Sequence, residues 1–394
     1  MKDEYIKIID LGMHPFADTF VSKNLLGMSE PIHPLECFLN KNTGEIRLGI
    51  STIDDDRYNL YDYSYTSSNS EFAKNHWIKY AKEVLKKTKT KATKKIVEIG
   101  SNDGFLSEQF KIKGHDIVGV DPSKYMSELA ATRGIETYTM LFNSTNSDII
   151  KEQQGLADLI VANNVVNHAN DTEDFMRGVS NLLKEDGCFV FELPYWYHTI
   201  CDNKFDQIYH EHVTYFTVKY SYDLLARFGF EIFDIEVVDY HGGSLRIYAN
   251  KTSGKPKMSN KTSDMIKTET SYGLFEEETY RYFMKNLENK RNNLLFELYK
   301  VKTMGYNIIG VGAAAKANTF LNYYNLDYKT LDYITDASIH KQGKYTPITR
   351  IPIVGDEIFS QYDEVYALIL SWNISDRIRE NIRNINEKTK FILP

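Results

Sequence analysis

One segment, "KIVEIGSNDGFLSEQF" (95–110), limits the possible fold of this chain more than any other. An apolar strand pattern runs into a turn that contains Gly100 and Gly104, and the turn leads directly into a helix pattern. Glycine lets the backbone turn tightly and approach a bound molecule that a Cβ would exclude. The segment therefore predicts the first strand and helix of a parallel α/β sheet, with a ligand at the sheet edge.

The next 140 or so residues continue this alternation of strands and helices. Three further segments, 116–121, 157–164 and 188–194, are apolar almost throughout, as strands buried on both faces usually are. After another helix pattern, "FEIFDIEVVD" and "SLRIYANK" are joined by the short "YHGG", which predicts an antiparallel hairpin. We therefore expect an α/β core over residues 86–250 that ends in a hairpin.

The remaining residues divide into three parts. Residues 1–85 are turn-rich and irregular apart from a final helix pattern, and we expect a small N-terminal domain there. Residues 251–302 begin as a polar linker and continue as a long helix. Residues 303–394 alternate strands and helices again, which predicts a second, smaller α/β domain.

Composition excludes several classes of protein. A net charge of −7 argues against a general binder of nucleic acid or acidic membranes, whose surface would be basic. No apolar run reaches the ~18 residues that a membrane-spanning helix needs, and the charged N-terminus lacks a signal-peptide pattern. The three cysteines show neither metal-ligand spacing nor a disulfide framework. We therefore expect a cytoplasmic protein.

The first glycine loop and the following strand together form a nucleoside-binding pattern. Asp121 ends the second strand, where its carboxylate can accept hydrogen bonds from ribose hydroxyls. The spacing E-x-G-x-x-x-G, which begins at Glu98, lacks the third glycine of a dinucleotide site. With the closing hairpin, this spacing is similar to that of S-adenosylmethionine (SAM) methyltransferases. The loop alone does not exclude an NAD oxidoreductase. It is also compatible with a plain tight turn followed by a surface carboxylate.

A second glycine loop, "GVGAAAKANT" (310–319), also runs into a helix N-terminus. Exposed backbone N–H groups and the helix dipole favour an anion at such a place, and Lys316 adds a full positive charge. Small residues that let a strand and a helix pack closely explain the same pattern equally well.

Six motifs occur in a fixed order along the chain: "EIGSNDG", "ANNVVNHANDTEDF", "FDQIYHEHVTYF", "HGGSLRIY", "GVGAAAKANTFLNYY" and "KQGKYTP". From about Ile9 to Pro394, the chain resembles the SAM-dependent sugar C-methyltransferases, which act on nucleotide-linked 4-keto-6-deoxy sugars in bacterial sugar pathways. The resemblance implies an α/β protein with a Rossmann-like SAM methyltransferase core. It also implies a small N-terminal domain of the zinc-binding type and a C-terminal Rossmann-like α/β domain, with the sugar nucleotide between these parts.

The resemblance also implies roles for individual residues. The expected SAM-binding residues are Glu98, Gly100, Asn102, Gly104, Asp121, Asn163 and Asn164. The expected substrate-binding residues are His168, His241, Lys316 and Asn318. The expected catalytic residues are Tyr63, Tyr65, Tyr209, Glu211 and His212. Asn163, Asn164 and His168 follow the fourth strand, at the edge where such sheets bind ligands, although loop capping is an alternative role for Asn163 and His168.

Two departures from the family pattern matter. Family members carry Cys-x-x-Cys pairs near the N-terminus, whereas the matching positions here hold Asn40 and Thr43, and Cys37 is out of register. Because a tetrahedral zinc site of this type needs thiolates, we expect no bound metal and a domain held by apolar packing. In the C-terminal part, four positions differ from the family pattern: Ala337, Ser338, Ile348 and Arg350. The identity of the nucleotide in the substrate is therefore left open.

The segment "YHEHVTYF" fits proton transfer next to a ketone. Removing such a proton needs a neutral base and a donor that stabilises the enolate oxygen, and histidine, with a reference pKa of ~6.5, is largely neutral in the cytosol. By resemblance the base is His212, while Glu211 and Tyr209 orient or hydrogen-bond, Tyr209 near the keto oxygen. A metal site lacks further ligands in the sequence, and a polar corner is the favoured interpretation of His210.

Tyr63 and Tyr65 alternate along an extended segment, so both side chains face one side. We expect one of them in the active site, while at least one packs the N-terminal domain onto the core.

Together with these observations, the resemblance implies methyl transfer from SAM to a carbon next to the keto group of a nucleotide-linked sugar, through an enolate. The setting would be bacterial surface-polysaccharide or deoxysugar biosynthesis. A sugar O-methyltransferase on the same scaffold and a non-catalytic sugar-nucleotide binding protein are the alternatives. Neither nucleic acid nor membrane is an expected partner; the oligomeric state is open, and a monomer is plausible.

Overall fold

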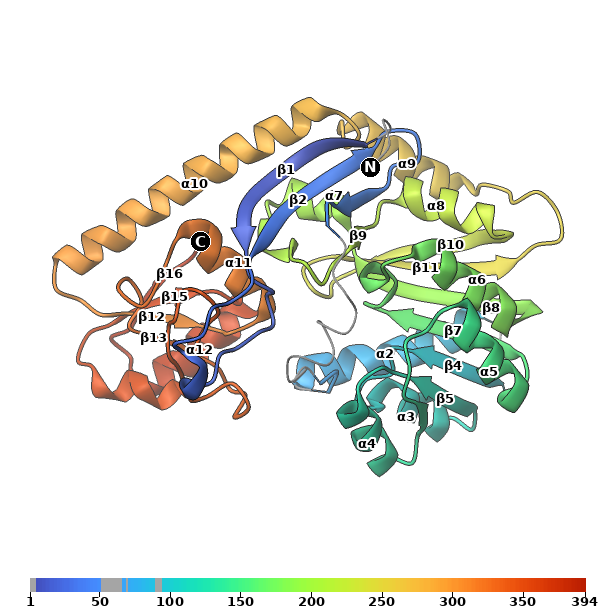
Figure 1. The fold of residues 1–394 in the computed structure, drawn as a ribbon, viewed down its shortest axis with the longest axis horizontal. Coiled ribbons are helices and arrows are strands. Elements are labelled where there is room, and N and C mark those ends of the chain that lie inside the picture. Colours follow the sequence, from blue (N-terminus) through green and yellow to red (C-terminus); the bar gives the residue numbers. More distant parts are fainter. Residues whose placement is uncertain (1–4, 51–65, 69, 89–93) are drawn as a thin grey trace.

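The computed structural model describes the chain except for residues 1–4, 51–65, 69 and 89–93. The strands form three separate sheets, of four, seven and five strands. A long helix, α10 (Glu277–Thr303), runs from the region of the first sheet to the C-terminal domain (Figure 1). Tyr63 and Tyr65 lie outside the described residues.

The largest sheet has seven strands in the order β10-β11-β8-β7-β4-β5-β6. Only β11 is antiparallel to its neighbours; it pairs in this way with both β8 and β10. Their bounds are β4 (Lys95–Ile99), β5 (Asp116–Val120), β6 (Glu136–Tyr138), β7 (Ala157–Asn163), β8 (Leu183–Pro194), β10 (Phe230–Val238) and β11 (Ser244–Lys251). The expected α/β core with a closing antiparallel hairpin is confirmed.

Helices cover both faces of this sheet. The apolar side of each helix packs against the apolar side chains of the strands, which removes both from water. Buried side chains of α5, α6 and α8 share one core with the sheet, and those of α2, α3 and α4 share another on the opposite face. Capping side chains fix where several begin: Ser70, Ser123, Asn143, Asp171 and Thr217. The bounds are α2 (Glu71–Lys87), α3 (Phe105–Ile112), α4 (Lys124–Thr132), α5 (Ser144–Gln154), α6 (Thr172–Leu182), α7 (Trp196–Cys201) and α8 (Val218–Arg227). Helix α2 thus packs on the core, although its residues fall in the range assigned to the N-terminal domain.

The N-terminal part is more regular than its sequence indicated. An antiparallel sheet in the order β1-β2-β3-β9 replaces the expected irregular segment: β1 (Tyr5–His14), β2 (His33–Asn40), β3 (Ile46–Leu48) and β9 (Thr214–Tyr215). Register shifts interrupt the pairing of β1 and β2, which obscures the period-two alternation that marks a strand. Strand β9 follows the "YHEH" motif directly, so this sheet ties the motif to the N-terminal segment.

The C-terminal domain has a parallel sheet in the order β14-β13-β12-β15-β16. Its elements are β12 (Ile308–Val311), α11 (Ala315–Tyr324), β13 (Tyr333–Thr335), β14 (Ile353–Val354), β15 (Tyr366–Ile369), α12 (Ser375–Ile385) and β16 (Lys390–Ile392). Helices α9 (Asn260–Ser271) and α10 (Glu277–Thr303) lead into it. Single turns of 3-10 helix occur at Lys23–Leu25, Val166–His168, Phe205–Gln207 and Trp372–Ile374, and a longer one at Asp356–Gln361.

One continuous apolar core joins the N-terminal sheet, α7, α10 and the C-terminal domain. Ile9 and Leu35 of the N-terminal sheet belong to it, as do Leu298 of α10 and Phe320 of α11. The N-terminal segment is therefore packed between the α/β domain that contains the seven-stranded sheet and the C-terminal domain. There it can contribute side chains to a site between these two domains.

Candidate active site

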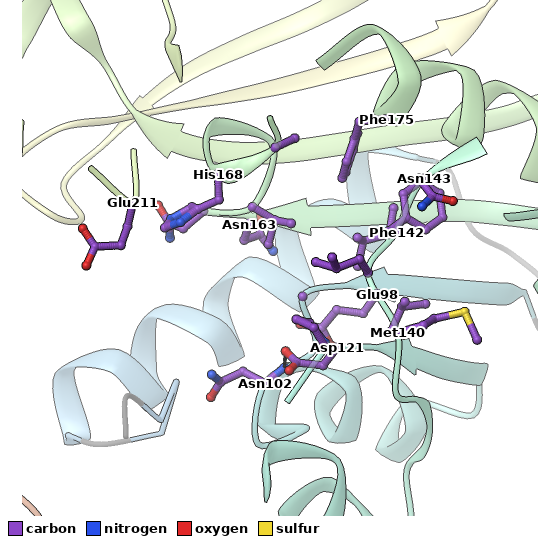
Figure 2. Close-up of a pocket in the computed structure, with 18 of the residues that line it drawn as sticks. Glu98, Asn102, Asp121, Met140, Phe142, Asn143, Asn163, His168, Phe175 and Glu211 are labelled. Atoms are coloured by element: carbon purple, nitrogen blue, oxygen red, sulfur yellow. Dashed lines mark hydrogen bonds between the residues drawn. The ribbon is translucent and has the colours of Figure 1, made fainter. Parts of the chain in front are cut away.

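A cavity of about 340 Å³ lies at the carboxyl ends of β4, β5 and β7. Figure 2 shows Glu211 at one end of it, Phe142, Asn143 and Phe175 at the other, and Asn163 between them. In an open parallel sheet this edge is the usual ligand site, because the strand-to-helix loops diverge there. The cavity also receives Phe16, Asp18 and Thr19 from the N-terminal segment.

The first glycine loop forms one wall of this cavity. Gly100 and Gly104 adopt φ angles of +71° and +74°, which side chains with a Cβ rarely tolerate. A Cβ on Gly100 would come within 2.1 Å of Val165 Cγ2, and Val165 is itself a wall residue. Glycine is needed at position 100 for both backbone conformation and space, so the loop can lie directly against a ligand.

Asp121 follows β5 and is held by two backbone donors. Its Oδ2 accepts a hydrogen bond from Asn102 N–H at 2.9 Å, and its Oδ1 accepts one from Ser123 N–H at 2.9 Å. Burial raises the pKa of Asp121 to about 6, and the two N–H donors oppose that rise. Each carboxylate oxygen keeps a second acceptor position for the ribose hydroxyls of a nucleoside.

Glu98, the last charged residue of β4, lines the floor of the cavity. Burial raises its pKa to about 8, with further upward contributions from Asp103 and Asp121, whereas the hydrogen bond from Ser107 Oγ (2.5 Å) acts in the opposite direction. Glu98 is therefore mostly protonated at neutral pH. This keeps the floor from carrying two adjacent negative charges.

Asn163 is the last residue of β7 and Asn164 follows it; both line the cavity. The oxygen and nitrogen of the Asn163 amide are buried without a well-formed hydrogen bond among the described residues. Such a group costs free energy unless a ligand or water satisfies it. The Asn163 amide, the Asp121 carboxylate, the glycine loop and the apolar end at Phe142 and Phe175 together fit the polar and aromatic parts of SAM.

A hydrogen-bonded pair, Tyr209 and His212, lies beside the Glu211 end. Tyr209 Oη and His212 Nε2 are 2.8 Å apart, and His212 Nδ1 is 3.0 Å from the carbonyl oxygen of Gln207. A carbonyl can only accept, so Nδ1 carries the proton and Nε2 accepts from the tyrosine hydroxyl. Burial lowers the pKa of His212 to about 4, well below the reference value used in the sequence analysis. His212 is thus neutral at physiological pH.

His212 is next to two residues that line the cavity, His168 and Glu211. Its ring meets that of His168 edge-on with centroids 5.0 Å apart. Glu211 Oε1 accepts a hydrogen bond from the backbone N–H of Asp18 at 3.1 Å. His210 instead faces Pro34, whose carbonyl oxygen lies 3.2 Å from its Nε2. This contact directs the His210 ring away from the Tyr209–His212 pair and is consistent with the polar corner favoured for His210 in the sequence analysis.

The three other expected substrate residues lie outside the lining of this cavity as described. His241 is held by its backbone carbonyl, which accepts from Gln207 Nε2 at 2.5 Å, and burial lowers the pKa of its ring to about 3. Lys316 Nζ lies 4.1 Å above the Trp372 ring and contacts Asn373. Asn318 donates to the carbonyl of Ala17 at 2.5 Å. Asn318 therefore positions the segment that carries Asp18.

Sequence reasoning missed Phe16, Asp18 and Thr19. They lie in "HPFADTF", where a lone aspartate in an otherwise apolar segment was the available signal. It also missed the contact between the cofactor loop and residues before α2. Ser67 N–H donates to Asn102 Oδ1 at 2.7 Å, and the Ser67 and Ser68 hydroxyls donate to the Asp103 carboxylate.

In the N-terminal loop where the resemblance led us to expect the positions of zinc ligands, Asn40 holds the backbone of the turn. Asn40 Oδ1 accepts hydrogen bonds from the backbone N–H groups of Asn42 (3.0 Å) and Thr43 (3.2 Å), and Cys37 is fully buried. Within the described part of the chain, no three His, Cys, Asp or Glu side chains gather where a metal could bind. Nor does any described helix have the length and apolar composition to cross a membrane.

Comparisons with known proteins match both halves of the chain. A family model described as a methyltransferase domain matches residues 71–235, and one described as a C-methyltransferase C-terminal domain matches residues 239–394. The C-methyltransferase NovU of Streptomyces niveus is 28% identical over 393 residues, covering 100% of this chain and 93% of that protein.

Other relatives match the core alone. The ubiquinone biosynthesis O-methyltransferase of Vibrio atlanticus is 28% identical over 110 residues, covering 27% of this chain and 46% of that protein. A solved SAM-dependent methyltransferase of Thermotoga maritima, a possible histamine N-methyltransferase, is 17% identical with a TM-score of 0.35, and covers 46% of this chain and 90% of that one. That score is too low to support an inference. The two matched models and the full-length relative show that this chain is a SAM-dependent C-methyltransferase, with S-adenosylmethionine as its cofactor.

Proposed function

We propose that the enzyme methylates a carbon next to the keto group of a nucleotide-linked sugar, such as a 4-keto-6-deoxy sugar. The observation that carries this proposal is the neutral Tyr209–His212 pair beside Glu211 and His168. A carbon can be methylated only after its proton is removed, and this pair can accept one. The choice of a nucleotide-linked sugar as substrate rests on the resemblance to the sugar C-methyltransferases. The full-length relative is itself named a C-methyltransferase.

We infer a path for this proton from the Tyr209–His212 hydrogen bond. Because Tyr209 Oη donates to His212 Nε2, a substrate proton can pass to the tyrosine oxygen while the tyrosine's own proton moves to Nε2. The Gln207 carbonyl holds the opposite ring nitrogen, so the ring keeps its orientation as it becomes charged. SAM, when bound, supplies the electrophilic methyl group.

His168 and Glu211 would orient the substrate above this pair. Both side chains lie at the cavity end nearest Tyr209 and His212. A ring N–H of His168 can donate a hydrogen bond to the oxygen that becomes negative as the proton leaves. Glu211 is fixed by the Asp18 N–H, so it can accept from a sugar hydroxyl without moving.

The decisive test is a product assay with SAM and candidate keto sugar nucleotides. A new methyl carbon bonded to carbon in the NMR spectrum supports the proposal. A methyl on oxygen would instead favour the O-methyltransferase alternative, and binding without turnover would favour a binding protein.

A second measurement addresses the base. His212→Asn should keep SAM affinity and lose about 10²–10⁴-fold in turnover, the usual contribution of general-base catalysis. In D₂O with S-adenosylhomocysteine, wild-type enzyme should exchange deuterium into the carbon next to the ketone, and the variant should not. His210→Asn, a buried histidine on the same loop that faces Pro34, is the matched control and should have a milder effect. Near-normal turnover of His212→Asn would move the base to Tyr209 or Glu211.

A further inference from the structure

Helix α10 carries two large aromatic side chains on its outer side. Tyr282 is 72% exposed and Phe296 is 75% exposed. The helix forms an edge of the molecule, and its buried residues, which include Leu287 and Leu298, face the interior from its opposite side (Figure 1). Single exposed apolar side chains are common and need no explanation. The residues around the two rings therefore decide whether the rings belong to a contact surface.

The two rings belong to a stripe of seven exposed residues, which we call the α10 stripe. Successive residues of an α-helix are rotated by about 100°, so all seven lie within about 40° of one line along the helix. A spacing of four, three and four residues occurs twice in succession, so the pattern repeats after eleven residues and stays on one face of a nearly straight helix. The members of the stripe are Glu278, Tyr282, Lys285, Asn289, Asn293, Phe296 and Lys300.

The chemistry of the stripe is complementary about its centre, Asn289. When two copies of α10 lie antiparallel across a twofold axis at Asn289, residues at equal distances from the centre in the two copies face each other. Glu278 and Lys300 are each eleven residues from the centre, so a carboxylate meets an ammonium. Tyr282 and Phe296 are each seven residues from it, so a ring meets a ring. Each of these contacts occurs twice, because the interface is twofold symmetric.

The central residues of the stripe set the register of such a pair. Lys285 of one copy faces Asn293 of the other, and the amide oxygen can accept a hydrogen bond from the ammonium. The two Asn289 side chains meet at the axis, where each amide can donate to the other and accept from it. A single polar residue at such a position fixes the register of paired helices and lowers their affinity. We therefore expect a reversible dimer, with a dissociation constant of about 10 μM.

The present contacts of the stripe leave it available. Glu278 Oε2 pairs with Arg281 Nη2 at 3.0 Å on the same helix, and both side chains are exposed. An exposed pair of this kind contributes little to stability and can exchange partners. As described, the active-site cavity has none of the seven stripe residues in its lining, so pairing through the stripe uses no residue of that site.

We propose that the α10 stripe is a dimerisation surface, on which a second copy of this chain lays its own α10 in the antiparallel direction. A second copy is the partner that this order of residues fits, because each half of the stripe carries the groups that the other half binds. The parallel arrangement is disfavoured, because it would place Glu278 against Glu278 and Lys300 against Lys300. The proposal does not depend on the identity of the methyl acceptor.

Sedimentation velocity on the full chain, over a range of roughly 1 to 200 μM around the expected dissociation constant, tests the aromatic contacts. Wild type should change from monomer to dimer within this range. The double variant Tyr282→Ser, Phe296→Ser should raise the dissociation constant ~10-fold or more, because it removes both ring contacts. Ile112→Ser is the matched control, since Ile112 is 71% exposed on α3, and it should dimerise as wild type does.

Charge exchange tests the register. Lys300→Glu places a glutamate opposite Glu278 in both halves of the interface, and at low salt it should weaken the dimer ~5-fold or more. Glu278→Lys should do the same by placing two lysines opposite each other. The double variant Glu278→Lys, Lys300→Glu restores opposite charges and should return the dissociation constant to within about twofold of wild type. In 1 M salt the differences among these variants should shrink, because the charges are screened.

Three outcomes would overturn the proposal. Wild type could stay monomeric over the whole range; sedimentation of that monomer with anionic vesicles would then assign the stripe to a lipid surface. The serine variant could dimerise as wild type does, which would place the dimer contact elsewhere. The exchanged charges could fail to restore a dimer that each single change weakens, which would exclude the antiparallel register. Circular dichroism and affinity for S-adenosylhomocysteine, expected to be unchanged, accompany each variant, and the charge variants decide the matter should the serine variant misfold.

Discussion

The two glycine loops of this chain show how one sequence pattern can serve two purposes. Each follows a parallel strand and opens a helix, and in each a glycine is required for close packing. A Cβ on Gly100 would come within 2.1 Å of Val165, and one on Gly312 within 2.1 Å of Ser371. The glycines alone therefore do not distinguish a ligand loop from a packing loop.

The surroundings of each loop make the distinction. The first loop lies in the wall of a cavity that holds the acceptor Asp121 and the Asn163 amide, which lacks a well-formed hydrogen bond among the described residues. In the second loop, the Ala313 N–H is already bonded to Asp336 Oδ2 at 2.9 Å, and the Ala313 carbonyl accepts from Lys341. The first loop has the equivalent bond, from the Asn102 N–H to Asp121 Oδ2, so bonded N–H groups do not separate the two loops. What separates them is the cavity beside the first loop and the lysine that the second loop positions.

The largest contrast is expected between Gly100→Ala and Gly312→Ala. At position 100 the left-handed backbone costs an alanine ~1–2 kcal/mol, and the Val165 clash adds to it. Relief of this strain should displace Gly100 or Val165, both of which line the cavity, so affinity for S-adenosylhomocysteine should fall ~100-fold or more. Gly312→Ala, with φ of +99° and a comparable clash, should lower the thermal midpoint and leave that affinity unchanged. Calorimetry and thermal unfolding of both variants measure this, and equal affinities would remove the distinction between the loops.

The core of this fold could be read from sequence because its signals are local. Buried parallel strands are apolar at nearly every position, and the glycine loop and Asp121 lie at their ends. The N-terminal sheet escaped prediction because register shifts interrupt the pairing of β1 and β2, and because its fourth strand, β9, comes from residues some 170 positions after β3. Its partner choice depends on tertiary packing that no local pattern encodes.

The candidate site was predicted in part for the same reason. Residues at strand ends, such as Asp121, Asn163 and His168, line the cavity, and the position of a strand end can be inferred locally. Asp18 and Lys341 meet only because the N-terminal segment packs against the C-terminal domain. Burial also decides the pKa of His212, which composition and spacing leave at its reference value.

Asp121→Asn should have the next largest effect, about tenfold weaker binding of S-adenosylhomocysteine. The amide keeps the size of the side chain but loses one acceptor, at a cost of about one charged hydrogen bond, ~1.5 kcal/mol. Asp336→Asn is the matched change at the second loop and should leave that affinity as it is, because its partner is the Ala313 N–H. Comparable losses in the two variants would show that the second loop also senses the cofactor.

Affinity should also depend on pH, by a smaller factor, through Asp121, which lies beside the first loop. The ionised Asp121 accepts ribose hydroxyls best, and its pKa is raised to about 6. Binding of S-adenosylhomocysteine should therefore weaken severalfold as the pH falls from 7.5 to 5.5 through this pKa. The Asp121→Asn variant should show a flatter profile over the same interval; a slope as steep as that of wild type would assign the titration to another group.

Lys316→Ala should have the smallest effect, and it tests the second loop most directly. The side chain loses its contacts with Trp372 and Asn373, and a cation–π contact of this kind contributes ~0.5–2 kcal/mol. Thermal stability should therefore drop by a few degrees at most, while the KM for the sugar nucleotide should change by less than twofold. Trp372→Leu is a useful companion, since it removes the same ring and also the hydrogen bond to Asp206 at 2.6 Å. A large rise in KM for Lys316→Ala, with SAM affinity unchanged, would restore the second glycine loop as a phosphate site and overturn the distinction drawn between the two loops.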